Sequence, residues 1–366
     1  MISASAAVLR AGDQPHVIED VTLDDPGPDQ IVVQVAATGF CHSDAVARAP
    51  KFAPIWPMIA GHEAAGVVEW VGSDVSGIEI GDHVVLTFAY CGTCSQCAEG
   101  HPAYCEAFLQ LNILGQQATG GAKATGAGGE QFMARWFGQS TFATRAVVDA
   151  RSAIVVDRDL PLDVLAPLGC GIITGAGTVL NVLDVRPGTS VAIFGVGAVG
   201  LAALLAAKAA GAESIIAVDL HQSRLELATE LGATATILGG DNASVAEQVQ
   251  KLTELGAHYA IDTTGVPEVI LAALKSLRSR GRCAAVGIQT GDLVLDGHAL
   301  GGGKQLVSVV EGDAEPQVHI PQLVQLWREG RFPFDRMLER FPFTAVNEAE
   351  KASMEGRAIK AVLVME

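Results

Sequence analysis

The second half of the chain alternates short apolar runs with longer amphipathic runs. Residues 191–194 form an apolar run that predicts a buried strand, and residues 198–211 predict a helix that ends in glycine. Further strands are predicted at 214–219, 235–238 and 258–263, with helices at 223–232 and 244–255 between them. Strands that alternate with helices in this way predict a doubly wound parallel sheet.

The first half of the chain has a different pattern of short strands and turns. Residues 31–36 form a compact β-type run, and residues 115–130 are poor in large apolar side chains and predict a flexible loop. After residue 308 the pattern is mixed again. We therefore predict an α/β protein in which a β-rich domain of residues 1–171 is interrupted by an α/β domain of residues 172–308 and completed by residues 309–366.

Composition narrows the class of protein. Apolar residues make up 49% of the 366 residues and charged residues 18%, which excludes wholesale disorder. The net charge of −17 repels nucleic acid and anionic lipid, so we expect neither as a partner.

The apolar run at 191–207 is short for a membrane span and predicts a buried strand, turn and helix. Clustered cysteines without a secretory signal pattern favour a reducing compartment, and we expect a cytoplasmic location.

A glycine-rich segment follows the first predicted strand of the α/β domain. Gly195, Gly197 and Gly200 read G-V-G-A-V-G, with Val199 inside the motif, at the start of a predicted helix. Glycine lets the backbone turn tightly and approach a pyrophosphate at the helix N-terminus. Asp219 ends the next predicted strand, where a carboxylate accepts hydrogen bonds from ribose hydroxyls and repels a 2′-phosphate. The series predicts an NAD site, against the alternative of a packing turn.

Four of the seven cysteines lie in one short stretch with the spacing C-x2-C-x2-C-x7-C. Four thiolates can complete a tetrahedral shell around zinc, which is typical of a structural site. An iron–sulfur cluster and a redox-active C-x-x-C pair are the alternatives, although the last cysteine is far away for a ferredoxin motif. The predicted structural zinc ligands are Cys91, Cys94, Cys97 and Cys105.

Several longer motifs resemble the zinc-dependent medium-chain alcohol dehydrogenases over essentially the whole chain. They include GHEAAGVVEWVG, GDHVV, the four-cysteine loop, the glycine motif and IKAVL near the end. FGQSTFAT, LGCGIITGAG and VEGDAEPQ are most similar to the branch that acts on aryl (benzyl) alcohols and on geraniol. The resemblance implies a GroES-like catalytic domain with an inserted Rossmann domain, two zinc ions per chain, NAD, and a homodimer or homotetramer.

The resemblance also implies a catalytic zinc. Its ligands would be Cys41 in GFCHSD, His62 in AGHEAAG and Cys170 in PLGCG. Two thiolates and an imidazole would leave one position open, where the metal acts as a Lewis acid on an alcohol. Asp44 would orient His62, and Glu63 matches a residue that approaches the metal transiently. A turn residue and a surface acid are the alternative readings of these two carboxylates.

The proton path departs from the family pattern. Ser43 matches the hydroxyl that takes the alcohol proton, but Val46 stands where many relatives carry a histidine that completes the relay. His42 occupies a position where relatives often carry a pyrophosphate-binding arginine. We hypothesise that His42 contacts the cofactor and also acts as the missing base. The alternative is that Ser43 passes the proton to water.

The remaining expectations concern the cofactor and the substrate. Lys360 and Arg224 match cations near the pyrophosphate and the adenosine ribose, with a solvated surface charge as the alternative for each. The substrate pocket is expected to include Phe52, Thr87 and Trp136. Aromatic walls suit a flat apolar alcohol, although ordinary core packing explains each of them as well.

These expectations combine into one predicted function. We expect NAD-dependent, reversible oxidation of a primary aromatic or allylic alcohol to its aldehyde. One alternative is a polyol or formaldehyde-adduct dehydrogenase of the same fold. Another is a nucleotide-binding relative without turnover, because this fold need not retain alcohol chemistry.

Overall fold

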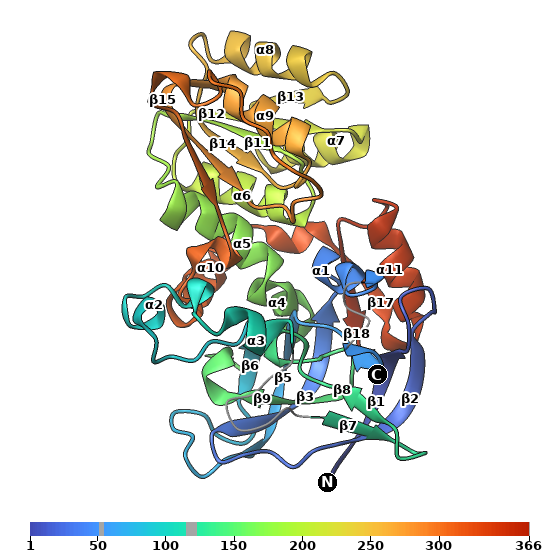
Figure 1. The fold of residues 1–366 in the computed structure, drawn as a ribbon. Coiled ribbons are helices and arrows are strands. Elements are labelled where there is room, and N and C mark those ends of the chain that lie inside the picture. The colour runs from blue at the N-terminus through green and yellow to red at the C-terminus, as the bar shows by residue number, and fades with distance from the viewer. Residues whose placement is uncertain (51–54, 115–122, 366) are drawn as a thin grey trace. The chain divides into compact units, whose positions relative to one another are not determined.

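Figure 1 shows the fold as a computed structural model, which describes residues 1–50, 55–114 and 123–365. The chain divides into two compact units. The first comprises Met1–Cys170, Glu315–Pro321 and Met337–Glu366, and the second comprises Gly171–Ala314 and Gln322–Arg336. Residues 309–314 and 322–336 therefore group with the second unit, and the predicted boundaries at 171/172 and 308/309 stay a prediction.

A small closed barrel forms one part of the first unit. Its strands, in order around the barrel, are β1 (Ile2–Leu9), β2 (Val17–Leu23), β7 (Lys123–Gly126), β8 (Gln131–Met133) and β4 (Met58–Ile59). Apolar side chains such as Phe132 and Phe142 are fully buried in the cluster that these strands contribute to.

Strand β7 differs from the loop predicted for residues 115–130. Residues 115–122 of that prediction lie outside the described residues, but Lys123–Gly126 pairs antiparallel with both β2 and β8. Only Ala124 of the strand is buried, so its four residues carry little apolar signal. Backbone pairing stabilises this segment on both sides: β8 follows it after a short turn, whereas β2 is distant in the sequence and is not encoded by the local pattern.

A second sheet completes the first unit. Its order is β10 (Ala153–Val156), β6 (His83–Leu86), β5 (Ala64–Val71), β3 (Gln30–Gly39), β18 (Lys360–Val364) and β17 (Leu338–Pro342), and β9 (Arg145–Asp149) also pairs with β3. In β18, Val362 lies opposite Gly39 of β3. The end of the chain therefore returns to the sheet of the β-rich unit. The helices of this unit are α1 (His42–Val46), α2 (Ser95–Ala98), α3 (Phe108–Asn112), α4 (Leu162–Leu165) and α11 (Val346–Met354).

The second unit contains a parallel six-stranded sheet. Its order is β13 (Ala235–Leu238), β12 (Ser214–Asp219), β11 (Ser190–Phe194), β14 (Ala257–Asp262), β15 (Leu277–Ala285) and β16 (Gln305–Ser308). All of these pairings are parallel, and the order changes direction beside β11. This is the strand order of a dinucleotide-binding fold, and ligands bind such sheets at the carboxyl ends of the strands where the order reverses. The predicted α/β fold class is confirmed.

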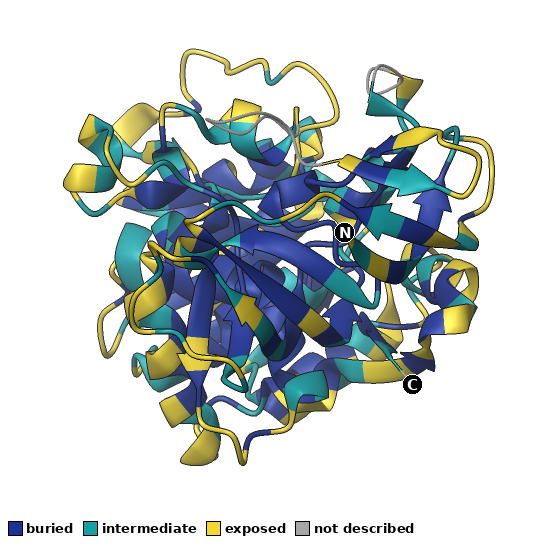
Figure 2. Ribbon diagram, turned by 90° about the horizontal axis from the view of Figure 1, so that it is seen from below, coloured by how far each residue is buried: buried dark blue, intermediate teal, exposed yellow. Residues whose placement is uncertain are grey.

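Helices connect these strands, as the alternating pattern predicted. They are α6 (Ala198–Ala209), α7 (Gln222–Leu231), α8 (Asn242–Leu252) and α9 (Pro267–Ser276), while α5 (Gly171–Gly177) precedes the sheet and α10 (Pro316–Arg328) follows it. Every residue of β11 and most residues of α6 are buried, which explains the apolar run at 191–207. Figure 2 shows this division, with buried strands in dark blue and exposed residues in helix faces and loops in yellow.

No single helix in the described part of the chain is long and apolar enough to cross a membrane. One bent pair, Leu162–Gly169 and Gly171–Val182, meets the requirement of length and composition when the two helices are counted together.

Candidate active site

Three residues that are far apart in the sequence converge in the first unit. Cys41 lies at the N-terminus of α1, His62 lies between β4 and β5, and Cys170 lies just before α5. Their ligand atoms all lie within 4.8 Å of one another. His62 and Cys170 are buried and Cys41 is half-buried. Two sulfurs and one imidazole nitrogen at this separation fit three of the four ligands of a tetrahedral zinc ion.

The hydrogen bonding of His62 fits a metal ligand. Its Nδ1 lies 2.9 Å from Oδ1 of Asp44, so the carboxylate holds the ring proton on Nδ1. The buried Nε2 atom forms no hydrogen bond of acceptable geometry with the described residues, although it lies close enough to the Cys41 thiol for each to shift the pKa of the other. A buried nitrogen with a free lone pair is energetically unfavourable unless something binds it. The unpartnered Nε2 beside two thiols therefore supports a bound cation.

The electrostatics of the cluster also favour a positive charge. A hydrogen bond with Cys170 lowers the pKa of Cys41 well below its usual value, against the effect of burial. Burial lowers the pKa of His62, but Asp44 and the Cys41 thiolate outweigh it and raise the pKa well above its usual value. Without a metal, the cluster therefore favours a thiolate at Cys41 next to a positive charge at His62, and a metal cation bound to Nε2 would supply that charge in place of a proton.

Asp44 is fully enclosed and has four hydrogen-bond partners. Besides His62, its Oδ1 accepts hydrogen bonds from the N–H of Gly61 at 3.0 Å and from Nε1 of Trp136 at 3.1 Å. Its Oδ2 accepts the N–H of Cys41 at 3.0 Å. A carboxylate with this many donors has a fixed orientation, and it fixes the ring of His62 in turn.

The residues expected in the proton path lie on α1. The Sγ of Cys41 lies 3.8 Å from Oγ of Ser43, so the Ser43 hydroxyl lies next to the cluster. His42 is exposed on the same helix, and Val46 is half-buried at its end. The arrangement places one hydroxyl beside the cluster and one titratable side chain at the surface.

Glu63 and Lys360 form a buried ion pair. The Nζ of Lys360 donates to Oε2 and Oε1 of Glu63 at 2.7 and 2.9 Å and to the carbonyl of Phe40 at 3.2 Å. Burial lowers the pKa of Lys360, but Glu63 outweighs it and raises the pKa above its usual value. A Cβ at Gly39 would lie 2.1 Å from Oε2 of Glu63, so only glycine leaves room for this carboxylate. The predicted contact of Lys360 with a pyrophosphate stays a prediction.

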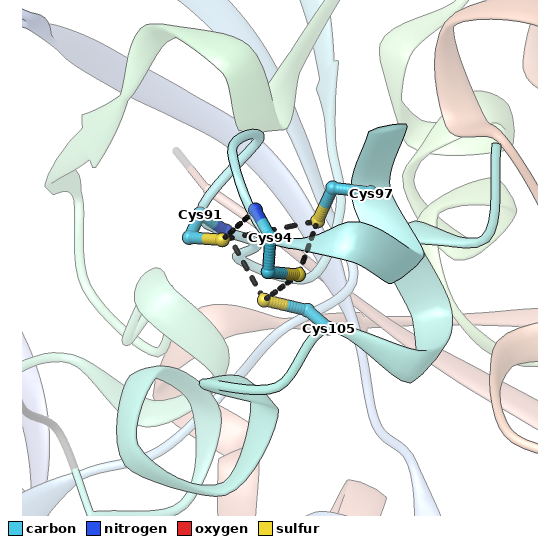
Figure 3. Close-up of side chains that lie close together, drawn as sticks. All are labelled: Cys91, Cys94, Cys97 and Cys105. Carbon is cyan, nitrogen blue, oxygen red and sulfur yellow. Dashed lines mark hydrogen bonds between the residues drawn. The ribbon is translucent and has the colours of Figure 1, made fainter. Parts of the chain in front are cut away.

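Figure 3 shows the four cysteines of the predicted structural site, whose sulfur atoms point toward one another. The Sγ···Sγ distances are 3.5 Å for Cys94–Cys97, 3.9 Å for Cys91–Cys97 and 4.0 Å for Cys94–Cys105. Burial raises the pKa of Cys91, but the backbone N–H groups of Thr93 and Cys94 outweigh it and lower the pKa to about 6. The loop thus favours at least one thiolate before any metal binds.

These distances separate the metal alternatives. Zinc–sulfur bonds of about 2.3 Å in a tetrahedron place neighbouring sulfurs about 3.8 Å apart. The observed separations of 3.5–4.0 Å match that value. A cluster of several iron atoms would push its cysteine ligands farther apart. All four cysteines are also free of disulfides, so the cluster fits a single tetrahedral metal ion.

The glycine motif of the second unit lies between β11 and α6, as predicted. Gly195 has φ of +87°, and a Cβ on Gly200 would lie 1.9 Å from the carbonyl oxygen of Gly195. The tight turn and the close packing therefore require glycine at both positions. A Cβ on Gly197 would meet nothing within 4 Å, so open space lies beside the helix N-terminus. Val199 lies half-buried in the first turn of α6. The residues fit a dinucleotide phosphate.

Asp219 lies at the carboxyl end of β12, next to this turn. Its Oδ2 accepts the N–H of Val196 at 2.8 Å, its Oδ1 accepts the N–H of His221 at 2.9 Å, and Arg224 lies 3.7 Å away. Each carboxylate oxygen retains capacity for a further donor. The geometry thus fits a carboxylate that is held in place while it receives ribose hydroxyls.

The residues expected in the substrate pocket have different positions. Phe52 lies outside the described residues. Thr87 is fully buried, and its hydroxyl donates to the carbonyl of Gly169 at 2.8 Å. Trp136 is 1% exposed and donates its indole N–H to Asp44. Contact of any of them with substrate stays a prediction.

Sequence reasoning missed two side chains that contact His62. The ring of Phe137 stacks on the imidazole with centroids 4.2 Å apart, and Nε2 of Gln139 donates to the His62 carbonyl at 3.0 Å. Both belong to the FGQSTFAT stretch, but nothing in their residue types pointed to a histidine far away in the sequence.

Comparisons with known proteins match both units. Residues 27–158 match the alcohol dehydrogenase GroES-like domain family, and residues 198–326 match the zinc-binding dehydrogenase family. Geraniol dehydrogenase of Castellaniella defragrans is 41% identical over 99% of this chain and 98% of its own length.

Two solved structures are similar over the whole chain. The benzyl alcohol dehydrogenase of Acinetobacter calcoaceticus has a TM-score of 0.94 and 37% identity, with full coverage of both chains. An alcohol dehydrogenase zinc-binding domain protein from Burkholderia ambifaria has a TM-score of 0.96 and 44% identity, covering 100% of this chain and 99% of that chain. The two cysteine-containing clusters are consistent with the two zinc sites expected from the sequence, and NAD is the typical cofactor of the family.

Proposed function

Because the chain belongs to the zinc-dependent medium-chain alcohol dehydrogenases, in the branch with benzyl alcohol and geraniol dehydrogenases, we propose that it oxidises a primary aromatic or allylic alcohol to its aldehyde. The reaction is reversible and NAD accepts the hydride. The observation that carries this proposal is the convergence of Cys41, His62 and Cys170. A non-catalytic relative has no need for a metal site with an open position beside a hydroxyl.

The ligand set supports the chemistry. A zinc ion held by two thiolates and one imidazole supplies a Lewis acid that lowers the pKa of an alcohol hydroxyl. The thiolates offset the charge of the cation, and Asp44 keeps Nε2 of His62 available for it. Glu63 follows His62 in the chain and forms an ion pair with Lys360. The ammonium group of Lys360 therefore balances the negative charge of the Glu63 carboxylate.

Ser43 is the proposed first acceptor of the alcohol proton. Its hydroxyl lies beside the Sγ of Cys41, and Ser43 is the one hydroxyl-bearing residue of the GFCHSD motif. Val46 carries no proton, so the proton leaves either through His42 or through water. Replacing His42 with Gln distinguishes the two routes: a changed rate–pH profile supports His42 as the base, and an unchanged profile supports water.

The cofactor site is proposed at the carboxyl ends of β11 and β12. Gly195, Gly197, Val199 and Gly200 would receive the pyrophosphate at the N-terminus of α6, and Asp219 would bind the adenosine ribose. Arg224, held near Asp219, would lie along the same ribose. A carboxylate at this place favours NAD over NADP because it repels a 2′-phosphate.

A substrate panel tests the proposal. We expect the purified protein with NAD to oxidise benzyl alcohol and geraniol with a kcat/KM at least about 100-fold above that for ethanol and sorbitol. The reason is that an aromatic or allylic group buries an apolar surface equal to that of several methylene groups, which stabilises the bound substrate and its transition state. If the protein preferred sorbitol or a formaldehyde adduct, the proposed substrate class would be wrong, but the protein would still be an alcohol dehydrogenase. Absence of turnover with any alcohol, at two zinc ions per chain, would contradict the proposal itself.

Two further expectations from the resemblance are part of the proposal. We propose a homodimer or homotetramer, which light scattering of the purified protein tests. A cytoplasmic location is proposed from the reducing chemistry that seven free thiols require. Fractionation of the producing cells tests it.

A further inference from the structure

Residues 136–142, which we name the support segment, are attached to the loop that carries His62. The N–H of Thr141 donates to the Gly61 carbonyl at 2.9 Å, and Nε2 of Gln139 donates to the His62 carbonyl at 3.0 Å. The hydroxyl of Ser140 donates to the Ile59 carbonyl at 2.6 Å. The backbone on both sides of His62 is therefore held by one short segment.

The support segment adopts an unusual backbone conformation. Phe137, Gly138 and Ser140 have φ of +51°, +70° and +54°, and two of these residues are not glycine. A bulky residue in the left-handed region persists only when its surroundings determine it, and such residues cluster at functional sites. Here the conformation places the ring of Phe137 flat against the His62 imidazole, with 19° between the planes.

Trp136 at the start of the segment contacts the same site through Asp44. Its Nε1 donates to Oδ1 at 3.1 Å, the oxygen that also faces His62 Nδ1 at 2.9 Å. Trp136 is 1% exposed and Asp44 is 2% exposed, so bulk water does not replace the indole as a donor. A hydrogen bond to a buried carboxylate is among the stronger ones in proteins.

We propose that Trp136 is a positioning residue for the catalytic zinc: its indole N–H holds Asp44, and Asp44 holds the ring of His62 with Nε2 toward Cys41 and Cys170. The proposal rests on the catalytic zinc of the proposed function. It differs from the expectation that Trp136 is a wall of the substrate pocket, because a wall acts on the substrate and a positioning residue acts on the metal.

Removing such a partner weakens the metal site. Loss of a group that orients a ligating histidine typically reduces metal affinity by 10–100-fold. In Trp136→Phe, the ring still fills most of the space, but Oδ1 of Asp44 loses a donor. The N–H groups of Gly61 and Cys41 still bind the carboxylate, but it is held less tightly, and the imidazole that depends on it is oriented less strictly.

The rival explanation is that Trp136 only fills the core. Trp56→Phe is a matched control, since Trp56 lies in the same unit and its Nε1 donates at 3.1 Å to a backbone carbonyl, that of Ala47. Both variants remove an indole N–H that donates to an oxygen, but only one of the oxygens belongs to Asp44.

The test follows release of zinc from the folded holoenzyme to an excess of a colorimetric chelator. The four-cysteine zinc serves as an internal reference in every sample. We expect Trp136→Phe to accelerate release of one of the two zinc ions by about 10–100-fold while the other is released at the wild-type rate. Trp56→Phe should release both ions as the wild type does.

A double-mutant cycle separates positioning from packing. If Trp136 acts through Asp44, then Trp136→Phe in the Asp44→Asn background should add less than about 2-fold to the release rate. With Co²⁺ in the catalytic site, the visible ligand-field spectrum should shift in Trp136→Phe and not in Trp56→Phe.

Three outcomes would overturn the inference: wild-type release in Trp136→Phe, equal acceleration for both ions, or full additivity with Asp44→Asn. A wild-type protein that holds only the four-cysteine zinc would instead refute the proposed function. The two failures are therefore distinguishable in the first measurement.

Discussion

The two metal-binding clusters of the first unit are built in opposite ways. Cys91, Cys94, Cys97 and Cys105 come from one loop, and three of the four are half-buried. The other cluster takes Cys41, His62 and Cys170 from three separate places in the chain and encloses its histidine completely. A local cluster needs only its loop and its metal. A dispersed cluster needs the packed domain, and its ligands are oriented by further residues such as Asp44.

The difference between the clusters separates stability from catalysis. Four thiolates complete the coordination of a zinc ion and leave no position for a substrate. Three ligands would leave one position open for a substrate, and the hydroxyl of Ser43 lies 3.8 Å from the Sγ of one of these ligands. Loss of the first metal should therefore affect folding, and loss of the second should affect turnover.

The largest expected effect comes from breaking the dispersed cluster. Replacing Cys170 with Ala removes one of three ligands, and we expect kcat/KM to fall by at least about 1,000-fold because metal Lewis-acid assistance contributes several kcal/mol. Metal analysis should show the zinc content falling from two ions to one while thermal unfolding changes little. Retained activity at one zinc per chain would contradict the assignment of this cluster.

Breaking the local cluster should have the reverse effect. Replacing the buried Cys105 with Ala should lower the free energy of unfolding by about 4 kcal/mol, since a structural zinc contributes folding free energy directly. For a domain of this size, that lowers the midpoint of thermal unfolding by roughly 8–16 °C. The kcat/KM of the remaining folded protein should stay within a few-fold of wild type. A large loss of kcat/KM without loss of stability would show that the two clusters are not separate in function.

A second buried histidine sharpens the comparison, because it lies beside a carboxylate without thiols. Burial lowers the pKa of His16 to about 4. The nearby Glu350 carboxylate raises this pKa, whereas Arg48, which pairs with Glu350, lowers it further. The unfolded chain, with a histidine pKa near 6.5, therefore binds a proton that the folded chain does not. Stability is complete above about pH 6.5 and falls as the pH drops toward 4, by up to about 3 kcal/mol.

Urea unfolding of the wild type and of His16→Gln between pH 4 and 8 isolates this group, because other titrations contribute to both proteins. We expect the difference in unfolding free energy between them to change with pH only in the window from about 6.5 to 4. A difference that is independent of pH would show that His16 is not held neutral.

The smallest effect concerns the second unit, where the site is local in sequence like the four-cysteine loop. Replacing Asp219 with Asn removes the charge from the proposed ribose site, and the KM for NAD should rise by roughly 10–100-fold, the value of one or two hydrogen bonds to a charged group. Relative activity with NADP should increase at the same time. An unchanged KM for NAD would remove Asp219 from the cofactor site.

The features that could be predicted from the sequence are those whose residues act within one element or turn. In the glycine motif and in the four-cysteine loop, the residues that form the site are close together in the sequence, so their spacing alone predicts the geometry. The parallel sheet follows from the alternation of strands and helices. The dispersed cluster came from resemblance, since no spacing joins Cys41 to Cys170. The structure then brought these side chains together from three elements.

Other features depend on packing that no local pattern encodes. The sequence predicts Lys360 as a cation near the pyrophosphate, with a solvated surface charge as the alternative, and gives no sign that it is buried against Glu63, nearly 300 residues away. Trp136 looks like an aromatic wall, yet its indole N–H lies on Asp44. The strand at Lys123–Gly126 has only one buried residue, and it pairs with the distant β2 as well as with the neighbouring β8. In each case a distant partner decides the outcome.

The most direct test of the account is an anomalous difference map measured at the zinc absorption edge on crystals of the purified protein. We predict two peaks per chain, one enclosed by the four cysteines and one bonded to Sγ of Cys41, Sγ of Cys170 and Nε2 of His62 at about 2.0–2.3 Å. A map with a peak only at the four cysteines, or with the second peak bonded to other side chains, would contradict the account.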